Sequence, residues 1–264
     1  MRKILTVFIA LFCMAALNQE VSAEVVFRNA SLLIQKNPGK SNEGVNWLVI
    51  HHNEYEAQKV MEWALENIGG TGYNFINRRR PRQRTLREGR GKLSYLFDPN
   101  RIFSREGILK NLRHYNGIFL HSRRYRTYEK RVISHIFENY AAKIRSLLPL
   151  DKKKYLIALH NTMNKSKFSL LNYRKKFGYT IYQNPDLHPK NFALVIRYED
   201  FVKLKEAKIN VVWQKETKKI QDDGSLAHYC KKNGYRYINV EGRFGDMEEH
   251  KKMVQTIYDL VTKP

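Results

Sequence analysis

The sequence predicts an α/β fold: one three-layer sandwich with a mixed, largely parallel sheet and helices on both faces. Short apolar runs alternate along the chain with longer stretches of helical periodicity, which is the pattern of strands joined by helical crossovers. No internal repeat and no linker rich in Pro, Gly or Ser interrupts residues 24–264, so we expect these residues to form a single domain.

The expected strands are short apolar runs bounded by polar or turn-forming residues. They cover residues 46–51, 95–98, 117–120, 155–160, 192–197, 210–213 and 235–240. The run at 155–160, YLIALH, has the continuous apolar character of a strand that is buried on both faces.

The expected helices carry apolar residues three or four positions apart. They cover residues 54–68, 125–148 and 247–261, and a shorter helix follows a turn at 222–225. Gly69 and Gly70 end the first of them. Residues 71–91 are polar, basic and without a clear period, so we expect a long loop beside the functional face of the sheet.

The N-terminus has the pattern of a secretory signal peptide. A short positive region precedes an apolar run at 4–17, and small residues at 21–23 mark a cleavage point. We therefore expect residues 1–23 to be a signal peptide and the mature protein to be secreted or periplasmic, without a transmembrane span. The alternative for this run, which is too short to span a membrane, is a buried strand or helix. The mature chain would keep only Cys230, so no internal disulfide is expected.

The chain is strongly basic, with 48 Lys and Arg residues against 25 Asp and Glu residues and a formal net charge of +23. The basic residues are spread along the chain, apart from one dense run at 78–90. An exported protein of this charge is attracted to anionic cell-envelope surfaces, and we do not expect nucleic acid to be its partner.

Residues that can carry out chemistry follow three of the expected strands. His51 ends the first strand and is followed by Glu54, His160 ends the strand at 155–160, and Glu241 follows the last strand. Ligands of open α/β sheets bind at the carboxyl ends of strands, so we expect these four side chains to meet at one edge of the sheet.

Two histidines and one carboxylate with an open fourth position make a catalytic zinc site. His51 and Glu54 are three residues apart at the beginning of a helix, which places both on one side, facing one ion. His160 would complete the ligand set for one Zn²⁺ per chain. His52 is the alternative to His51, but on a strand it would point to the opposite face. Glu241 is then free to act as the general base.

Four segments resemble, in the same order, the motifs of zinc carboxypeptidases and of the succinylglutamate desuccinylase/aspartoacylase group. They are VIHHNE at 49–54, DPNRIF at 98–103, ALHNT at 158–162 and INVE at 238–241. The resemblance implies that Asn100 and Arg101 grip a substrate carboxylate, which suits the two parallel hydrogen bonds of a guanidinium group. Without the resemblance, the second segment reads as a surface turn.

The resemblance implies two further roles. An arginine that precedes the Asn-Arg pair would hold the oxyanion, and we favour Arg90, with Arg87 and Arg84 as alternatives. Tyr229 would approach the substrate from the helix that follows the turn at 222–225.

The sequence therefore predicts an exported zinc metallohydrolase that cleaves an amide bond next to a free carboxylate, with residues 24–264 as its catalytic domain. A carboxypeptidase that acts on peptides, cell-wall peptides among them, is the preferred form. A deacylase of N-acyl amino acids is the second, and a non-catalytic basic protein that binds anionic polymer or nucleic acid is the third. A cleft open at one end would fit a peptide, whereas a closed pocket would fit an N-acyl amino acid.

Overall fold

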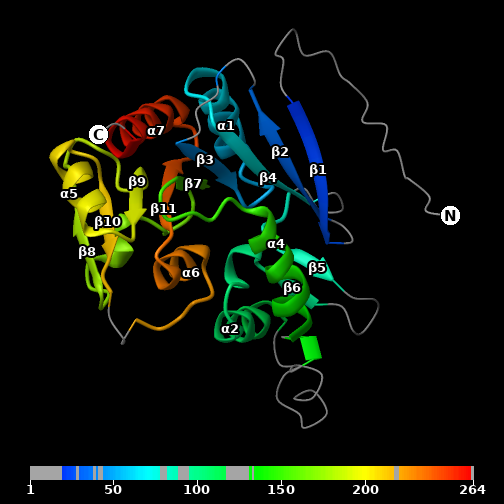
Figure 1. Cartoon of the computed structure of the whole chain (residues 1–264). Coiled ribbons are helices and arrows are strands. Elements are labelled where there is room, and N and C mark those ends of the chain that lie inside the picture. Colours follow the sequence, from blue (N-terminus) through cyan, green and yellow to red (C-terminus); the bar gives the residue numbers. More distant parts are fainter. Residues whose placement is uncertain are drawn as a thin grey trace.

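The protein is built on one nine-stranded mixed sheet (Figure 1). The computed structural model describes residues 20–27, 30–37, 40, 44–77, 82–88, 95–116, 131–132, 134–216 and 220–262. The strands of the sheet are β1 (Glu20–Phe27), β2 (Ala30–Lys36), β3 (Val45–Val49), β4 (Thr71–Asn77), β7 (Tyr155–Thr162), β8 (Tyr179–Tyr182), β9 (Phe192–Val195), β10 (Val211–Gln214) and β11 (Arg236–Arg243).

Their order across the sheet is β1-β2-β4-β3-β7-β11-β9-β10-β8. The four central strands β4, β3, β7 and β11 are parallel, β9 and β10 form a second parallel pair antiparallel to β11, and the outer strands pair antiparallel. The predicted mixed, largely parallel sheet is therefore confirmed.

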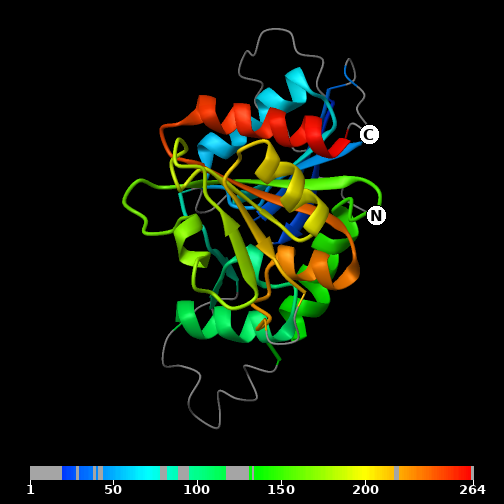
Figure 2. The same cartoon turned by 90° about the vertical axis from the view of Figure 1, so that its left-hand side faces the viewer.

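Helices cover both faces of the sheet (Figure 1, Figure 2). One face packs against α1 (Tyr55–Asn67), α5 (Tyr198–Glu206) and α7 (Met247–Thr262). The other packs against α2 (Arg105–Asn116), α4 (Ala142–Leu147) and α6 (Leu226–Asn233), together with the two-stranded sheet of β5 (Leu86–Glu88) and β6 (Tyr95–Phe97). This is the predicted three-layer arrangement.

The central strand β7 shows why this sequence needs two helical layers. All eight of its residues are buried. Leu156 and Ala158 belong to the core on one side of the sheet, and Ile157 and Leu159 belong to the core on the other. A strand covered on both faces must be apolar at nearly every position, which explains the unbroken run that identified it in the sequence.

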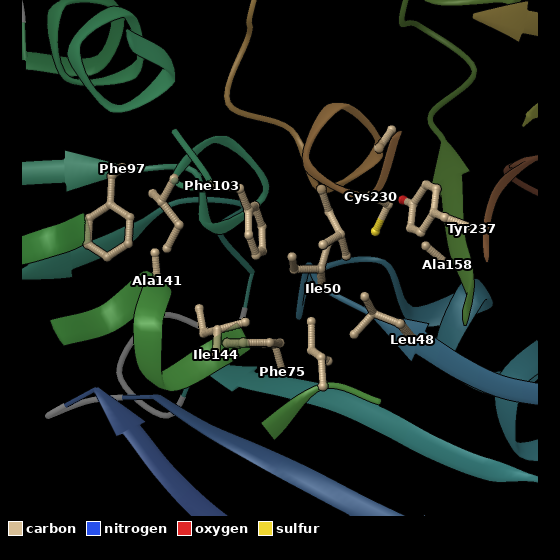
Figure 3. Close-up of a cluster of buried hydrophobic side chains, with 14 of the residues drawn as sticks. Leu48, Ile50, Phe75, Phe97, Phe103, Ala141, Ile144, Ala158, Cys230 and Tyr237 are labelled. Carbon is tan, nitrogen blue, oxygen red and sulfur yellow. The ribbon is translucent and has the colours of Figure 1, made fainter. Parts of the chain in front are cut away.

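The core on the α2 and α6 side joins the sheet to the layer formed by α2, α4, α6, β5 and β6, which is called the second layer below (Figure 3). Side chains from the sheet meet side chains from β6, the helices and the loops between them, among them Leu48, Ile50, Ala158, Tyr237, Phe97, Phe103, Ile144 and Cys230. Cys230 is fully buried here, and burial raises the pKa of its thiol, so it behaves as the small apolar group expected from the sequence.

The structure confirms most of the expected elements. The strands predicted at 46–51, 95–98, 155–160, 192–197, 210–213 and 235–240 are β3, β6, β7, β9, β10 and β11, and the first and last predicted helices are α1 and α7. The strand predicted at 117–120 lies outside the described residues. The helix predicted at 125–148 is described in part, and there a π-helix, Ile136–Ala141, continues into α4.

The prediction of a loop over 71–91 is wrong for its first part, which forms β4 between β2 and β3, and for Leu86–Glu88, which form β5. Buried and half-buried side chains alternate along β4, but two of the buried ones are Asn74 and Asn77. These amides hide the apolar pattern, so the segment reads as polar. The antiparallel β1–β2 pair, β8, α2 and α5 were not predicted either.

The predicted signal peptide, residues 1–23, falls largely outside the described residues, which begin at Glu20 with β1. The signal therefore stays a prediction. Within the described part of the chain, no helix is both long enough and apolar enough to cross a membrane.

Two glycines bring the second layer together beside the sheet edge. Gly107 in α2 and Gly224 in the loop before α6 touch through their backbones, and a Cβ atom on Gly107 would overlap the backbone of Gly224. Gly224 has a φ of +72°, a left-handed conformation that favours glycine. Its carbonyl oxygen accepts the N–H of Phe103 at 3.0 Å, which draws the turn after β6 against the beginning of α6.

We predict that Gly107→Ala destabilises the protein, although alanine normally stabilises a helix by about 0.5–1 kcal/mol relative to glycine. The added methyl group must displace the backbone at Gly224, and such overpacking costs about 1–3 kcal/mol. Urea unfolding measures the change in the free energy of unfolding. A variant that is more stable than the wild type would contradict the close contact.

Candidate metal centre

Three side chains that can hold a metal ion converge at the carboxyl edge of the central strands. His51 lies two residues beyond β3, Glu54 immediately precedes α1, and His160 lies on β7. The Nδ1 atoms of the two histidines are 3.3 Å apart, and the Glu54 carboxylate lies 3.0 Å from that of His51 and 2.8 Å from that of His160. All three residues are buried. The structure thus brings together the three ligands expected from the sequence.

His52 points away from this group. Its Nδ1 accepts the backbone N–H of Asn77, at the end of β4, at 3.1 Å. The preference for His51 over its neighbour therefore agrees with the geometry.

Asp98 orients His51. Its Oδ1 lies 2.8 Å from Nε2 of His51 and accepts that N–H. With a metal ion bound, the proton would stay on Nε2, and the lone pair of Nδ1, which faces Glu54 and His160, would be free to bind the ion. A carboxylate behind the outer nitrogen is the usual support of a metal-binding histidine, because it fixes the ring and makes the inner nitrogen a better ligand.

Asp98 is itself held from several sides. The backbone N–H of Asn100 donates to Oδ1 at 2.8 Å, and Nε of Arg84 donates to Oδ2 at 2.9 Å. The side chain of Asn111 in α2 accepts the backbone N–H of Asp98 at 3.0 Å and donates to its carbonyl oxygen at 2.9 Å. The second layer therefore fixes the carboxylate that fixes His51.

The charges at the centre favour ionised carboxylates. Burial raises the pKa of Glu54, but His160 and His51 lower it by more, so its net pKa is depressed. Burial likewise opposes the ionisation of Asp98, yet His51 and Arg84 hold its pKa well below the usual range. Burial and Arg84 lower the pKa of His51, while Asp98 and Glu54 raise it, and the net shift is upward. The centre therefore attracts a cation.

The beginning of α1 shows how Glu54 is kept free for this role. Glu54 occupies the N-cap position, but its side chain makes no capping hydrogen bond. The N–H of Ala57, which an N-cap side chain would normally bind, donates instead to Oδ1 of Asn161 on β7 at 3.2 Å. Because Asn161 caps the helix, the Glu54 carboxylate can turn toward the two histidines.

Glu241 lies beside the three ligands. It occupies the position on β11 that pairs with His160 on β7, and side chains at the same level of neighbouring parallel strands point to the same face. Thr162 Oγ1 donates to one oxygen of Glu241 at 3.0 Å, and Asn239 Nδ2 donates to the other at 3.2 Å. The carboxylate is buried and fixed, yet it lines a cavity.

A cavity of about 490 Å³ opens beside the centre and is lined by Glu54, His160 and Glu241. Asn100 and Arg101 form part of its wall. Their positions are set by α6 and its loop. The Asn100 Oδ1 accepts the N–H of Leu226 at 3.1 Å, and Arg101 pairs with Asp223 at 3.1 Å. Exposed side chains, among them Met163, Phe168 and Lys176, also line the cavity, so it reaches the surface.

The arginine that reaches the cavity in the described part of the run at 78–90 is Arg84. Besides its bond to Asp98, it lies 3.8 Å from the Glu54 carboxylate, and its side chain is 45% exposed. Arg90, the favoured arginine in the sequence, lies outside the described residues. Arg87 is described but does not line the cavity.

Tyr229 does not line the cavity. It lies on α6 and packs against Phe103, with ring centroids 5.8 Å apart, on the side of the helix that faces a second pocket. Tyr173 and Tyr179 line the cavity instead. Burial raises the pKa of both hydroxyl groups, with Glu241 contributing at Tyr173, so both stay protonated and can donate hydrogen bonds.

A second group of possible metal ligands, Asp222, Asp223 and His228, forms a turn and a helix cap. Asp222 accepts the N–H of Gly224 at 2.8 Å, and Ser225 caps α6 by accepting the N–H of His228 at 3.2 Å. This agrees with the turn expected at 222–225.

The geometry of His51, Glu54 and His160 fits a tetrahedral ion. Ligand atoms about 2.0–2.1 Å from zinc lie roughly 3.3 Å from one another, which is close to the separation of the two Nδ1 atoms. Both nitrogens face the ionised Glu54 carboxylate, at 3.0 Å from His51 and 2.8 Å from His160. Two imidazole nitrogens and one carboxylate are also the kind of ligands that zinc prefers.

The sequence did not predict that Asp98 supports His51, or that Arg84 binds Asp98. Asp98 was part of a motif, but its role needs a contact with His51, 47 residues earlier in the chain. Asp98 follows β6, which belongs to the separate two-stranded sheet, so strand order in the main sheet does not reveal this contact.

No family model and no curated protein matches the chain. Among solved structures, it is similar to a succinylglutamate desuccinylase from Chromobacterium violaceum, with 15% identity, a TM-score of 0.41, and coverage of 92% of this chain and 67% of that one. It is also similar to a succinylglutamate desuccinylase/aspartoacylase from Rhodobacter sphaeroides, with 9% identity, a TM-score of 0.41, and coverage of 95% of this chain and 68% of that one. A third similar structure is the cell shape determinant protein Csd4 from Helicobacter pylori, with 11% identity, a TM-score of 0.42 and coverage of 92% of this chain. The match covers 55% of Csd4, so the chain spans little more than half of that protein.

Proposed function

We propose that the protein is an exported zinc-dependent hydrolase that removes a residue with a free carboxylate from the end of a peptide. The observation that carries the proposal is the convergence of His51, Glu54 and His160 beside an open cavity that Glu54, His160 and Glu241 line. Two imidazoles and one carboxylate favour zinc over magnesium or calcium, which prefer oxygen ligands.

His51 Nδ1, His160 Nδ1 and the Glu54 carboxylate would hold one Zn²⁺ per chain. A bound zinc ion supplies Lewis acidity and lowers the pKa of water at its open position. Asp98 keeps the His51 proton on Nε2, so that Nδ1 presents a lone pair to the ion.

Glu241 acts as the general base and then as the general acid. Thr162 and Asn239 hold its carboxylate toward the cavity, where it takes a proton from the attacking water and delivers it to the leaving amine.

Arg101 and Asn100 hold the free carboxylate of the substrate. Arg101 presents a guanidinium in the cavity wall, and the Asn100 amide is oriented by its bond to Leu226, which leaves its NH₂ end for the substrate. Asp223 already pairs with Nη1 of the Arg101 guanidinium at 3.1 Å. The substrate carboxylate therefore binds the remaining N–H groups of Arg101 or displaces Asp223. Arg84, which lines the cavity, would donate to the carbonyl oxygen of the scissile bond.

A peptide fits this site better than an N-acyl amino acid. The cavity continues from the buried ligands to exposed side chains, so a longer chain can extend out of it while its terminal carboxylate is held inside. A deacylase of small substrates would need a closed pocket. The predicted signal peptide would bring the enzyme to peptides outside the cytoplasm.

We predict that wild-type protein binds one zinc ion and that His51→Ala and His160→Ala abolish this binding. Asp98→Asn should lower the zinc affinity about 10–100-fold, because the supporting carboxylate is lost while all three ligands remain. Titration against a chromogenic chelator measures the affinity, and Asp151→Asn, in a surface turn, is the control. Zinc binding of unchanged strength in His51→Ala or His160→Ala would exclude the proposed centre.

We predict that Glu241→Gln keeps its zinc and loses peptidase activity by a factor of about 10²–10⁴ or more, since glutamine cannot carry the proton. Amino acid release from peptides and zinc content are measured on the same sample. Glu248→Gln, an exposed residue of α7, is the matched control. Full activity in Glu241→Gln would remove the general base from the mechanism, and a wild type that is inactive on every peptide would support the non-catalytic alternative.

We predict that the wild type prefers peptides with a free terminal carboxylate to the same peptides with a terminal amide. Arg101→Met should raise KM for the free acid about 10–100-fold, the range expected for a lost charge-assisted hydrogen bond, and should leave the amide unaffected. Arg105→Met removes an arginine that pairs with Glu138 on the surface and is the control. An equal loss on both peptides would assign Arg101 a structural role only.

A further inference from the structure

A basic and apolar loop borders the cavity. Residues 163–177, between β7 and β8, contain Lys165, Lys167, Arg174, Lys175 and Lys176, and all five side chains are exposed. No acidic residue occurs anywhere from 152 to 185. The loop is therefore more strongly cationic than a uniform spread of the net charge would make it.

The same loop exposes large apolar side chains. Met163 is 53% exposed, Phe168 36%, Leu171 42% and Phe177 63%. Of the seven large apolar side chains that are exposed in the described part of the chain, four lie within these residues. A single exposed apolar side chain is common on any protein, but a cluster marks an interaction surface.

The loop is ordered by its own contacts. Ser169 and Asn172 cap a 3₁₀ helix, Leu170–Tyr173, whose first residue, Leu170, is buried and donates its N–H to the carbonyl oxygen of Pro189 at 2.9 Å. The Phe168 ring lies 5.8 Å from that of Phe192 in β9. The fold therefore presents Leu171 to the solvent while it buries Leu170.

We propose that residues 163–177 dock on the surface of an anionic phospholipid bilayer. Apolar side chains among lysines are the composition of segments that lie in the membrane interface, where the apolar groups enter the acyl boundary and the cations face the headgroups. A soluble anionic polymer would use the five cations but would leave the exposed Leu171 and Phe177 without a function.

Docking by this loop would set the cavity close to the membrane. Met163, Phe168 and Lys176 belong both to the loop and to the cavity wall. In Figure 2, the loop after β7 projects from the left-hand side of the molecule. Substrate would then enter the cavity near the bilayer surface. This proposal stands independently of the proposed hydrolase, because it needs neither zinc nor turnover.

The test is co-sedimentation with phosphatidylcholine vesicles with and without phosphatidylglycerol. The wild type should bind only the anionic vesicles. Two variants should each lose at least about tenfold in affinity: Lys165→Gln/Lys167→Gln/Lys175→Gln, which removes charge, and Leu171→Ser/Phe177→Ser, which removes apolar surface. The controls are Lys152→Gln/Lys153→Gln/Lys154→Gln and Tyr55→Ser/Tyr198→Ser, which change equally exposed residues elsewhere. Urea unfolding of each variant verifies that it is folded.

Several results would overturn the proposal. Unchanged vesicle binding by Leu171→Ser/Phe177→Ser, together with equal binding of polyphosphate by wild type and this variant, would make the loop a site for soluble polyanions. An equal loss in the control lysine variant would assign binding to net charge alone. A dimer that Leu171→Ser/Phe177→Ser dissociates in sedimentation velocity would make the surface an interface between two copies of the chain.

Discussion

The contact between Asp98 and His51 is the interaction on which the centre depends. By accepting the proton on Nε2, Asp98 fixes the ring so that Nδ1 faces Glu54 and His160, where it can bind a metal ion. The result is a buried set of electron donors at distances that suit one metal ion, with a second carboxylate to balance its charge. Without Asp98, the His51 ring is free to carry its proton on Nδ1, where the proton would point toward the ion in place of a lone pair.

The rest of the fold serves this geometry. Parallel strands deliver His51, His160 and Glu241 to one edge of the sheet, because side chains that follow parallel strands gather at their carboxyl ends. The second layer, through Asn111 of α2, holds the backbone of Asp98. Asn161 caps α1, so the Glu54 carboxylate is free to bind. Each functional side chain is therefore positioned by a residue whose own task is structural.

Much of the fold and the meeting of His51, Glu54 and His160 could be predicted from the sequence, because a fully buried strand such as β7 must be apolar throughout and its end residue stands out. β4 could not be predicted in the same way, since Asn74 and Asn77 are buried within it and conceal its pattern. Arg84 could not be distinguished from its neighbours in a run of arginines, because only the fold shows which of them reaches Asp98. Tyr229 was predicted to approach the substrate, but spacing does not tell which side of α6 it occupies. Contacts between distant segments decide all three cases.

The most direct measurement is a crystal structure of zinc-loaded protein with anomalous diffraction at the zinc absorption edge. We expect one anomalous peak about 2.0–2.1 Å from Nδ1 of both His51 and His160, with Glu54 as the third protein ligand and Asp98 still bound to Nε2 of His51. A peak at Nε2 of either histidine, or a zinc ion bound elsewhere with this group empty, would contradict it.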